Sequence, residues 1–305
     1  MNKIVLLGAN GYIGQHLASK LINENCLELY LFDIQEKSVN NFPNYYQLNL
    51  LEDIPEEYKE IIISANYIFH FSGITGTLKS IEYNRTYINV NEIGLLNILD
   101  IIRKIDGIKP KIIFPSTRLI YKGAKNTLLR EDAEKEFKTI YSVNKFACEQ
   151  YLEIYKSLYN ITYCILRICV PYGNMLESNL SFGTISHFIN KAKSKENIII
   201  YGDGSLKRTF THIDDLTNLI IKGGLSKKTD NQTFNIASNN HLTLLEVAQP
   251  IATKYNVKIE LKEFPEQDLI IESGDTIFDG RKLKDILFYE YKHNFNDWIK
   301  NLKTV

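Results

Sequence analysis

The sequence predicts a doubly wound α/β fold, in which helices cover both faces of a parallel sheet. Up to about residue 169, short apolar runs alternate with longer segments whose apolar residues recur at helical spacing. The short runs are almost continuously apolar, which is typical of strands buried on both faces. Strand–helix–strand repeats join parallel strands by right-handed crossovers, so this alternation predicts the doubly wound class.

The individual elements follow from the same patterns. Strands are expected at residues 3–9, 27–33, 46–50, 67–73, 111–117 and 162–169, with helices at 12–24, 88–105 and 140–159. Beyond residue 170 the sequence predicts a turn at 171–174, helices at 183–195, 212–225 and 242–255, and strands at 198–204 and 233–238. We therefore expect a first domain at residues 1–169 and a smaller, interleaved lobe at 170–305, with some of its elements returning to the first sheet.

Composition narrows the functional class. The 305 residues carry 36 Lys and Arg against 36 Asp and Glu, and this balance gives no electrostatic reason to expect nucleic acid or an anionic membrane as a partner. No apolar run approaches the ~18 residues of a membrane-spanning helix. The cysteines (Cys26, Cys148, Cys164 and Cys169) form no C-x-x-C pair, so we expect buried free thiols, no metal and a cytoplasmic protein.

The end of the first strand predicts a dinucleotide site. It reads G8-A-N-G11-Y-I-G14 and opens a helix, so the chain can turn tightly and approach a pyrophosphate with its backbone, as in a Rossmann domain. The free N–H groups at the helix N-terminus favour an anion. Asp33 ends the second strand, where its carboxylate can bind both adenosine ribose hydroxyls and repel a 2′-phosphate. This favours NAD over NADP.

Tyr141 and Lys145 are candidates for proton transfer. They share one face of the helix predicted at 140–159. A nearby ammonium favours the phenolate form of a tyrosine, so Tyr141 could serve as general base or acid. Tyr121 and Lys125 have the same spacing, but Gly123 makes a regular helix there unfavourable. We interpret Tyr121 as a packing residue.

Taken together, these motifs resemble the extended short-chain dehydrogenase/reductase family, in its nucleotide-sugar epimerase, dehydratase and reductase branch. The resemblance runs in order along nearly the whole chain, through GANGYIG, Asp33, HFSG, INVNEIGLLNIL, PSTRLIY, YSVNK, LRICVPYGN, IYGDGSLKRTFTHIDDL and FNIAS. It implies a bound NAD, a nucleoside-diphosphate sugar as substrate, and a Rossmann domain followed by a nucleotide-sugar-binding lobe.

The resemblance also implies roles for particular residues. The catalytic centre would consist of Thr117, which holds the sugar oxygen, with Tyr141 and Lys145. The cofactor-binding residues would be Gly8, Asn10, Gly11, Tyr12, Ile13, Gly14, Asp33, Ile34, Asn49, Leu50, Phe71, Ser72, Gly73, Asn89, Tyr141 and Lys145. The substrate-binding residues would be Thr75, Thr117, Arg118, Val170, Thr184, Tyr201 and Arg208, with Arg208 bidentate on the diphosphate. Asp203 is a further candidate for lining the nucleotide site.

The chain departs from the family pattern at two positions. Val170 replaces an asparagine that commonly contacts substrate, and Asn174 replaces a proline. Cys169 and His187 could suggest an acid pair, as in some keto-sugar enzymes. Cys169 lies in an apolar strand and His187 inside a helix, so we assign both ordinary structural roles.

Residues 118 and 119 argue against one of the reactions that this branch catalyses. A 4,6-dehydratase normally has Asp and Glu directly after the threonine, whereas this chain has Arg118 and Leu119, and leucine cannot transfer a proton. We therefore expect a C4 oxidoreductase of a nucleotide sugar, with the 4-epimerase as leading form. The alternatives are a 4-keto-sugar reductase, a C4 dehydrogenase or a non-catalytic NAD-binding sensor. The resemblance implies a homodimer paired through helices 88–105 and 140–159, and polysaccharide biosynthesis is a plausible setting.

Overall fold

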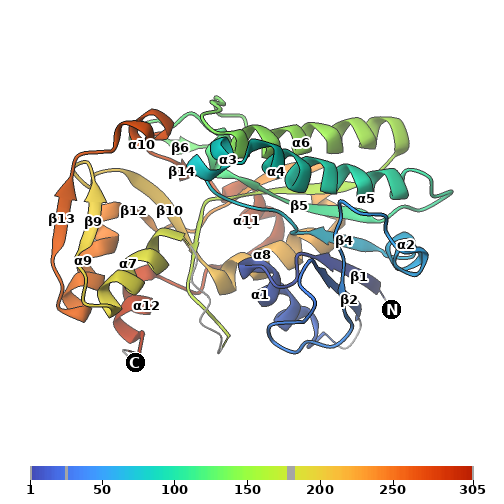
Figure 1. Ribbon diagram of the computed structural model, residues 1–305, viewed down its shortest axis with the longest axis horizontal. Coiled ribbons are helices and arrows are strands. Elements are labelled where there is room, and N and C mark those ends of the chain that lie inside the picture. Colours follow the sequence, from blue (N-terminus) through green and yellow to red (C-terminus); the bar gives the residue numbers. More distant parts are fainter. Residues whose placement is uncertain (1, 25–26, 177–182, 304–305) are drawn as a thin grey trace. The chain divides into compact units, whose positions relative to one another are not determined.

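The computed structural model describes residues 2–24, 27–176 and 183–303 (Figure 1). The chain divides into two compact units, each assembled from separate segments. The first contains Met1–Ile120, Thr139–Arg167 and Ile220–Phe234, and the second Tyr121–Lys138, Ile168–Leu219 and Asn235–Val305. The domain boundary expected after residue 169 lies two residues from the division between Arg167 and Ile168. However, the segment 121–138, expected in the first domain, belongs to the second unit.

The described part of the first unit contains a seven-stranded sheet with strand order β11-β7-β5-β4-β1-β2-β3. Its strands are β1 (Asn2–Leu7), β2 (Leu27–Asp33), β3 (Tyr45–Gln47), β4 (Tyr67–His70), β5 (Lys111–Thr117), β7 (Tyr163–Ile168) and β11 (Gln232–Ile236). The pairings from β5 to β3 are parallel, and Leu7 aligns with Phe32 on β2 and with His70 on β4. The order reverses between β1 and β4, the switch point at which doubly wound sheets bind ligands. The predicted fold class is confirmed.

Helices cover this sheet on both faces (Figure 1). They are α1 (Tyr12–Leu21), α2 (Glu56–Ile63), α3 (Leu78–Glu82), α4 (Asn84–Ile88), α5 (Gly94–Ile102) and α6 (Ile140–Tyr159). Fully buried strand residues such as Ile68 and Phe114 share one core with Leu99 of α5 and Leu152 of α6. This core fixes α6 over β5, which holds the start of the helix near the carboxyl end of that strand.

The second unit has smaller sheets, with strand orders β12-β10-β8, β13-β9 and β14-β6. Its strands are β6 (Leu128–Leu129), β8 (Val170–Tyr172), β9 (Ile198–Tyr201), β10 (Lys207–His212), β12 (His241–Thr243), β13 (Ile259–Lys262) and β14 (Ile277–Phe278). Its helices are α7 (Gly183–Lys193), α9 (Leu244–Tyr255), α10 (Glu266–Ile271), α11 (Arg281–Leu287) and α12 (Phe295–Asn301), while α8 (Ile213–Leu225) passes from the second unit into the first.

Some sequence-based element predictions need correction. Residues 171–174 were expected to be a turn, but β8 includes Pro171 and Tyr172 and pairs with β10. The helix expected at 88–105 is interrupted by a π-helical turn at Asn89–Ile93. None of the helices in the described ranges is both long enough and apolar enough to cross a membrane.

Candidate active site

Thr117 and Tyr141 meet at the end of β5. Thr117 is the last residue of that strand, and Tyr141 lies in the first turn of α6. A capping box fixes this turn, because Thr139 Oγ1 accepts a hydrogen bond from the N–H of Ser142 at 3.1 Å. The Thr117 hydroxyl lies near enough to the Tyr141 hydroxyl to lower its pKa, and both side chains are buried. The structure therefore brings together two of the three predicted catalytic residues.

Burial dominates the electrostatics of the pair Tyr141 and Lys145. It raises the pKa of Tyr141, and the nearby Thr117 hydroxyl offsets only part of that rise. Burial also lowers the pKa of Lys145, to about 8. Burial is thus the largest influence on the pKa of Tyr141, and the expectation that Lys145 favours its phenolate stays a prediction.

Lys145 is surrounded by aromatic and backbone groups. Its Nζ lies 4.5 Å from the centroid of the Phe114 ring, and the His70 ring stacks on the same phenylalanine at 6.2 Å. A Cβ at Gly73 would lie 3.9 Å from Nζ. Among the described residues, no carboxylate forms a salt bridge with this ammonium. Its donors thus face the strand-end segment at residues 71–73, where the sequence predicted the cofactor.

The glycine turn has the geometry that a dinucleotide site requires. Gly8 has a φ of +86°, and a Cβ there would meet the Phe71 carbonyl carbon at 2.5 Å. At Gly14 a Cβ would lie 2.0 Å from the Gly8 carbonyl oxygen. Helix α1 begins at this turn, and no side chain caps its N-terminus. Backbone of the turn and the first N–H groups of α1 are therefore placed to approach a phosphate.

Asp33 and Asn10 link this turn to the end of β2. Asp33 Oδ2 accepts a hydrogen bond from the N–H of Asn10 at 2.9 Å, so the carboxylate lies beside the turn as the sequence predicted. Asn10 Nδ2 donates to Gln35 Oε1, the Lys37 carbonyl and Tyr45 Oη at 2.8–2.9 Å, and its Oδ1 accepts from Val39. The side chain of Asn10 thus positions the loop after β2, and its contribution to a cofactor site would come from the backbone.

Three other predicted cofactor residues have different surroundings. Ile34 is 62% exposed next to Asp33. Asn49 forms a local turn, in which its Nδ2 donates to Glu52 and its Oδ1 accepts from Leu51. Leu50 packs in the core under α5, and its carbonyl accepts a hydrogen bond from Asn97. The roles of these residues toward an adenine stay predictions.

The structural role expected of Asn89 belongs to Asn91. Asn89 is exposed, whereas Asn91 is 1% exposed. Asn91 Oδ1 accepts from the N–H of Ile74 at 2.9 Å, and its Nδ2 donates to the carbonyl of the same residue at 3.1 Å. Asn91 therefore holds the segment that follows β4. The two asparagines are two residues apart, and both lie in the π-helical turn.

The predicted substrate residues are distributed over both units. In the first, Thr75 is exposed and its carbonyl accepts a hydrogen bond from Tyr87 Oη, while Arg118 is half-buried in a 3-10 turn directly after Thr117. In the second, Val170 is buried and Thr184 half-buried. Tyr201 is 40% exposed and lies against Phe264.

Arg208 and Tyr121, both in the second unit, are buried. Arg208 is 4% exposed and pairs with Glu272 at 2.5 Å, a partner that the sequence did not indicate. Tyr121 is fully buried and donates a hydrogen bond to Asn235 Oδ1 at 2.8 Å, so its interpretation as a packing residue is confirmed.

Sequence comparison agrees with this geometry. Residues 4–237 match the profile of the NAD dependent epimerase/dehydratase family. A Methanocaldococcus jannaschii protein named "Putative UDP-glucose 4-epimerase" is 30% identical over 248 residues, which span 76% of this chain and 80% of that protein. The chain belongs to the NAD-dependent epimerase/dehydratase family. It is an NAD-dependent enzyme.

Two further proteins are similar to this chain over most of its length. The UDP-N-acetyl-alpha-D-glucosaminuronate decarboxylase of Bacillus cytotoxicus is 26% identical over 263 residues, covering 82% of this chain and 79% of that protein. The crystal structure of Thermotoga maritima UDP-glucose 4-epimerase with UDP-glucose superposes with a TM-score of 0.84 at 25% identity, covering 98% of this chain and 96% of that one. The family thus includes members with different reactions.

The residues at the glycine turn fit NAD, as membership of the epimerase/dehydratase family requires. Gly8 and Gly14 allow the turn to pack directly against the chain's own backbone, where any side chain would clash, and Asp33 offers a carboxylate beside the turn. Lys145 has donors available for a ribose hydroxyl near Gly73. When bound, oxidised NAD supplies the hydride acceptor and a positively charged nicotinamide.

Proposed function

We propose that this enzyme is a nucleoside-diphosphate-sugar 4-epimerase. The observation that carries the proposal is the placement of Thr117 at the end of β5 beside Tyr141 in the first turn of α6, with Lys145 one helical turn further along that helix. In this reaction Thr117 would orient the sugar C4 hydroxyl, and Tyr141 would take the proton of that hydroxyl and later return it. NAD, held by the glycine turn and Lys145, would supply the reversible hydride transfer that permits inversion at C4.

The residues after Thr117 favour a reaction without dehydration. Arg118 and Leu119 form the 3-10 turn at this position and provide no carboxylate for removing a C5 proton or protonating a C6 hydroxyl. Hydride transfer and one proton transfer need only the centre described above. The names of related UDP-sugar 4-epimerases support a nucleotide sugar as substrate.

A C4 dehydrogenase or 4-keto-sugar reductase would use the same centre in one direction. NMR of the purified protein with UDP-, GDP-, CDP- and dTDP-hexoses separates the two, since an epimerase yields the C4 epimer without net change in NADH. Turnover restricted to keto sugars plus NADH would refute the epimerase. A Tyr141→Phe variant that retains full activity would assign the proton transfer to a group other than Tyr141.

We also propose that the enzyme acts as a homodimer through α6. Val143, Ile154 and Leu158 lie on one face of this helix and are 45%, 51% and 69% exposed. Exposed apolar residues that share one helix face are typical of an interface between protein surfaces. Light scattering should give twice the mass of one chain, and Leu158→Glu should shift that mass toward the monomer.

A further inference from the structure

Arg208 is almost completely enclosed by the second unit. Its Nη1 donates to the carbonyls of Lys207 and Gly274, at 2.9 and 2.6 Å, and its Nη2 donates to Glu272 Oε1 at 2.5 Å. The residues that follow Glu272 lie along β10, where Arg208 bridges to Thr276. The guanidinium therefore has fixed partners on two sides, and one of them carries a negative charge.

Glu272 is held in this position by other contacts. Its Oε1 also accepts a hydrogen bond from the N–H of Gly274 at 3.0 Å, and its carbonyl accepts one from Lys138 Nζ at 2.7 Å. A carboxylate so close to a buried guanidinium cancels most of its charge. An anion that approaches Arg208 would therefore also meet the negative charge of Glu272.

The two side chains differ in their freedom to move. The Arg208 side chain is 5% exposed, whereas that of Glu272 is 24% exposed. Glu272 can therefore rotate toward solvent at lower cost, while Arg208 stays bound to two carbonyls. Carboxylate and phosphate oxygens make the same kind of charge-assisted hydrogen bond to a guanidinium.

We propose that Glu272 competes with the substrate's diphosphate for Arg208 and so sets the affinity for the nucleotide. This inference rests on the proposed nucleotide-sugar function. In the empty protein Glu272 takes the place of a phosphate oxygen on Nη2 and neutralises the arginine. A bound diphosphate displaces the Glu272 side chain. Because the ion pair between Glu272 and Arg208 must be broken first, the net free energy of diphosphate binding to Arg208 is smaller. The carboxylate thereby weakens nucleotide binding and hastens its release.

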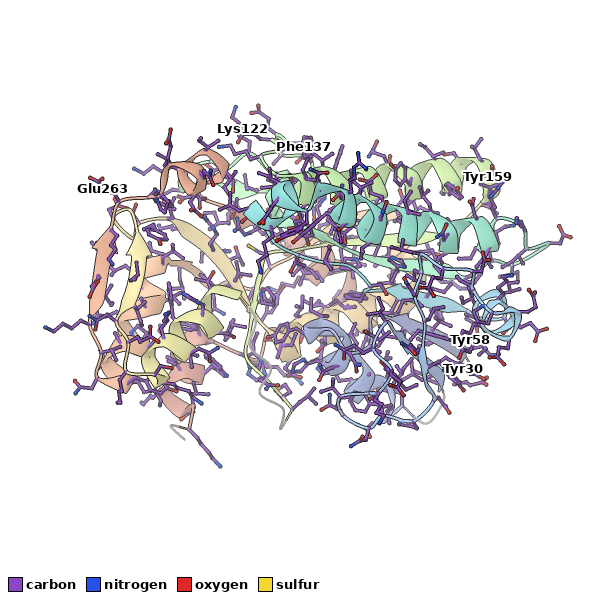
Figure 2. All side chains as sticks on the ribbon, in the orientation of Figure 1. Tyr30, Tyr58, Lys122, Phe137, Tyr159 and Glu263 are labelled. Carbon is purple, nitrogen blue, oxygen red and sulfur yellow. The ribbon has the colours of Figure 1, made fainter. Side chains whose placement is uncertain are left out.

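The test compares Glu272→Gln with the unaltered enzyme. Glutamine keeps an oxygen that can accept from Gly274 and Arg208 but removes the charge. Calorimetric titration of the full-length protein with UDP, GDP, CDP and dTDP should show about tenfold tighter binding of the preferred nucleotide, and unchanged NAD binding. Glu263→Gln is the control, because Glu263 is an exposed carboxylate of the same unit (Figure 2) and should leave all affinities unchanged.

Two further variants make the result decisive. Glu272→Ala removes the carboxylate entirely and should tighten binding in the same direction, while Arg208→Gln should weaken binding at least tenfold. If Glu272→Gln and Glu272→Ala bind no more tightly than the unaltered enzyme while Arg208→Gln weakens binding, Glu272 only orients the arginine and this inference is wrong. If no form binds any of the four nucleotides although NAD binds normally, the proposed substrate class is wrong as well.

Discussion

Replacing His70 with leucine should remove a large part of the acid sensitivity of the fold between pH 7 and pH 5. His70 is fully buried at the end of β4, and neither ring nitrogen has a hydrogen-bond partner among the described residues. Burial, together with the charge of Lys145, lowers its pKa from 6.5 to about 3. The imidazole is therefore neutral in the folded protein throughout this pH range.

The sign of the effect follows from where the proton binds. Below pH 6.5 the unfolded chain takes up a proton at His70 and the folded protein does not, so stability falls as the pH drops from 6.5 toward 3. Between pH 7 and pH 5 this difference lowers the free energy of unfolding by about 2 kcal/mol, at 1.36 kcal/mol per pKa unit. Leucine has no titrating group, and it removes two unpaired polar atoms from the core.

The assay is urea unfolding of the unaltered protein and of His70→Leu at pH 7 and pH 5, followed by circular dichroism. The variant should lose about 2 kcal/mol less than the unaltered protein over this range. His187→Gln provides the control, because His187 is exposed and its replacement should leave the pH dependence unchanged. Equal pH dependence of His70→Leu and the unaltered protein would show that His70 titrates normally, and the reasoning from burial would then be wrong.

Other variants address the site and its support. Tyr141→Phe should lower kcat by roughly 10²–10⁴-fold, because the proton at the sugar oxygen loses its carrier, while NAD binding measured by fluorescence stays within about twofold. Asp33→Asn should reduce the preference for NAD over NADP by about tenfold in steady-state kinetics, since the charge that repels a 2′-phosphate is removed. Glu149→Leu should lower the free energy of unfolding by about 3–5 kcal/mol, because it leaves buried Arg167, now paired at 2.6 Å, without its carboxylate.

Each of these predictions has a contrary result. Retention of kcat in Tyr141→Phe would move the proton transfer to another group. An unaltered cofactor preference in Asp33→Asn would mean that Asp33 serves only to hold the N–H of Asn10. For Glu149, the matched control is Glu153→Leu on the same helix, an exposed site that should change stability by less than about 0.5 kcal/mol. Equal effects of the two leucine variants would contradict the role assigned to the buried pair.

Much of the first sheet could be predicted from sequence because its signals are local. The run at residues 3–9, the glycine turn and the run at 27–33 each consist of a few consecutive residues, and each can be recognised in the sequence without its partners in the fold. The same holds for Tyr141 and Lys145, which are one helical turn apart. Local periodicity and turn chemistry are therefore enough to predict the first strands, the glycine turn and the helix that carries Tyr141 and Lys145.

The rest depends on contacts between distant segments. Glu272 is 64 residues from Arg208, and no local pattern pairs them. Asn91 and Asn89 are indistinguishable by type, and only the hydrogen bonds of Asn91 to Ile74, 17 residues away, distinguish them. Strand β10 reads KRTFTH and is buried from Arg208 to His212 although Phe210 is its one apolar residue, so its sequence lacks the continuous apolar run of a central strand. Pairing partners of this kind appear only in the folded chain.

The segmented composition of the first unit has a consequence for synthesis. Strand β7 ends at Ile168, but its neighbour at the sheet edge, β11, begins only at Gln232. At ~5–20 residues per second, a ribosome needs on the order of 10 seconds to make the chain between them. During that interval the outer edge of β7 has no strand to pair with, and it is open to pairing with another nascent chain. Slow translation of this stretch, or a chaperone bound to it, would therefore affect the yield of folded enzyme more than the same delay elsewhere.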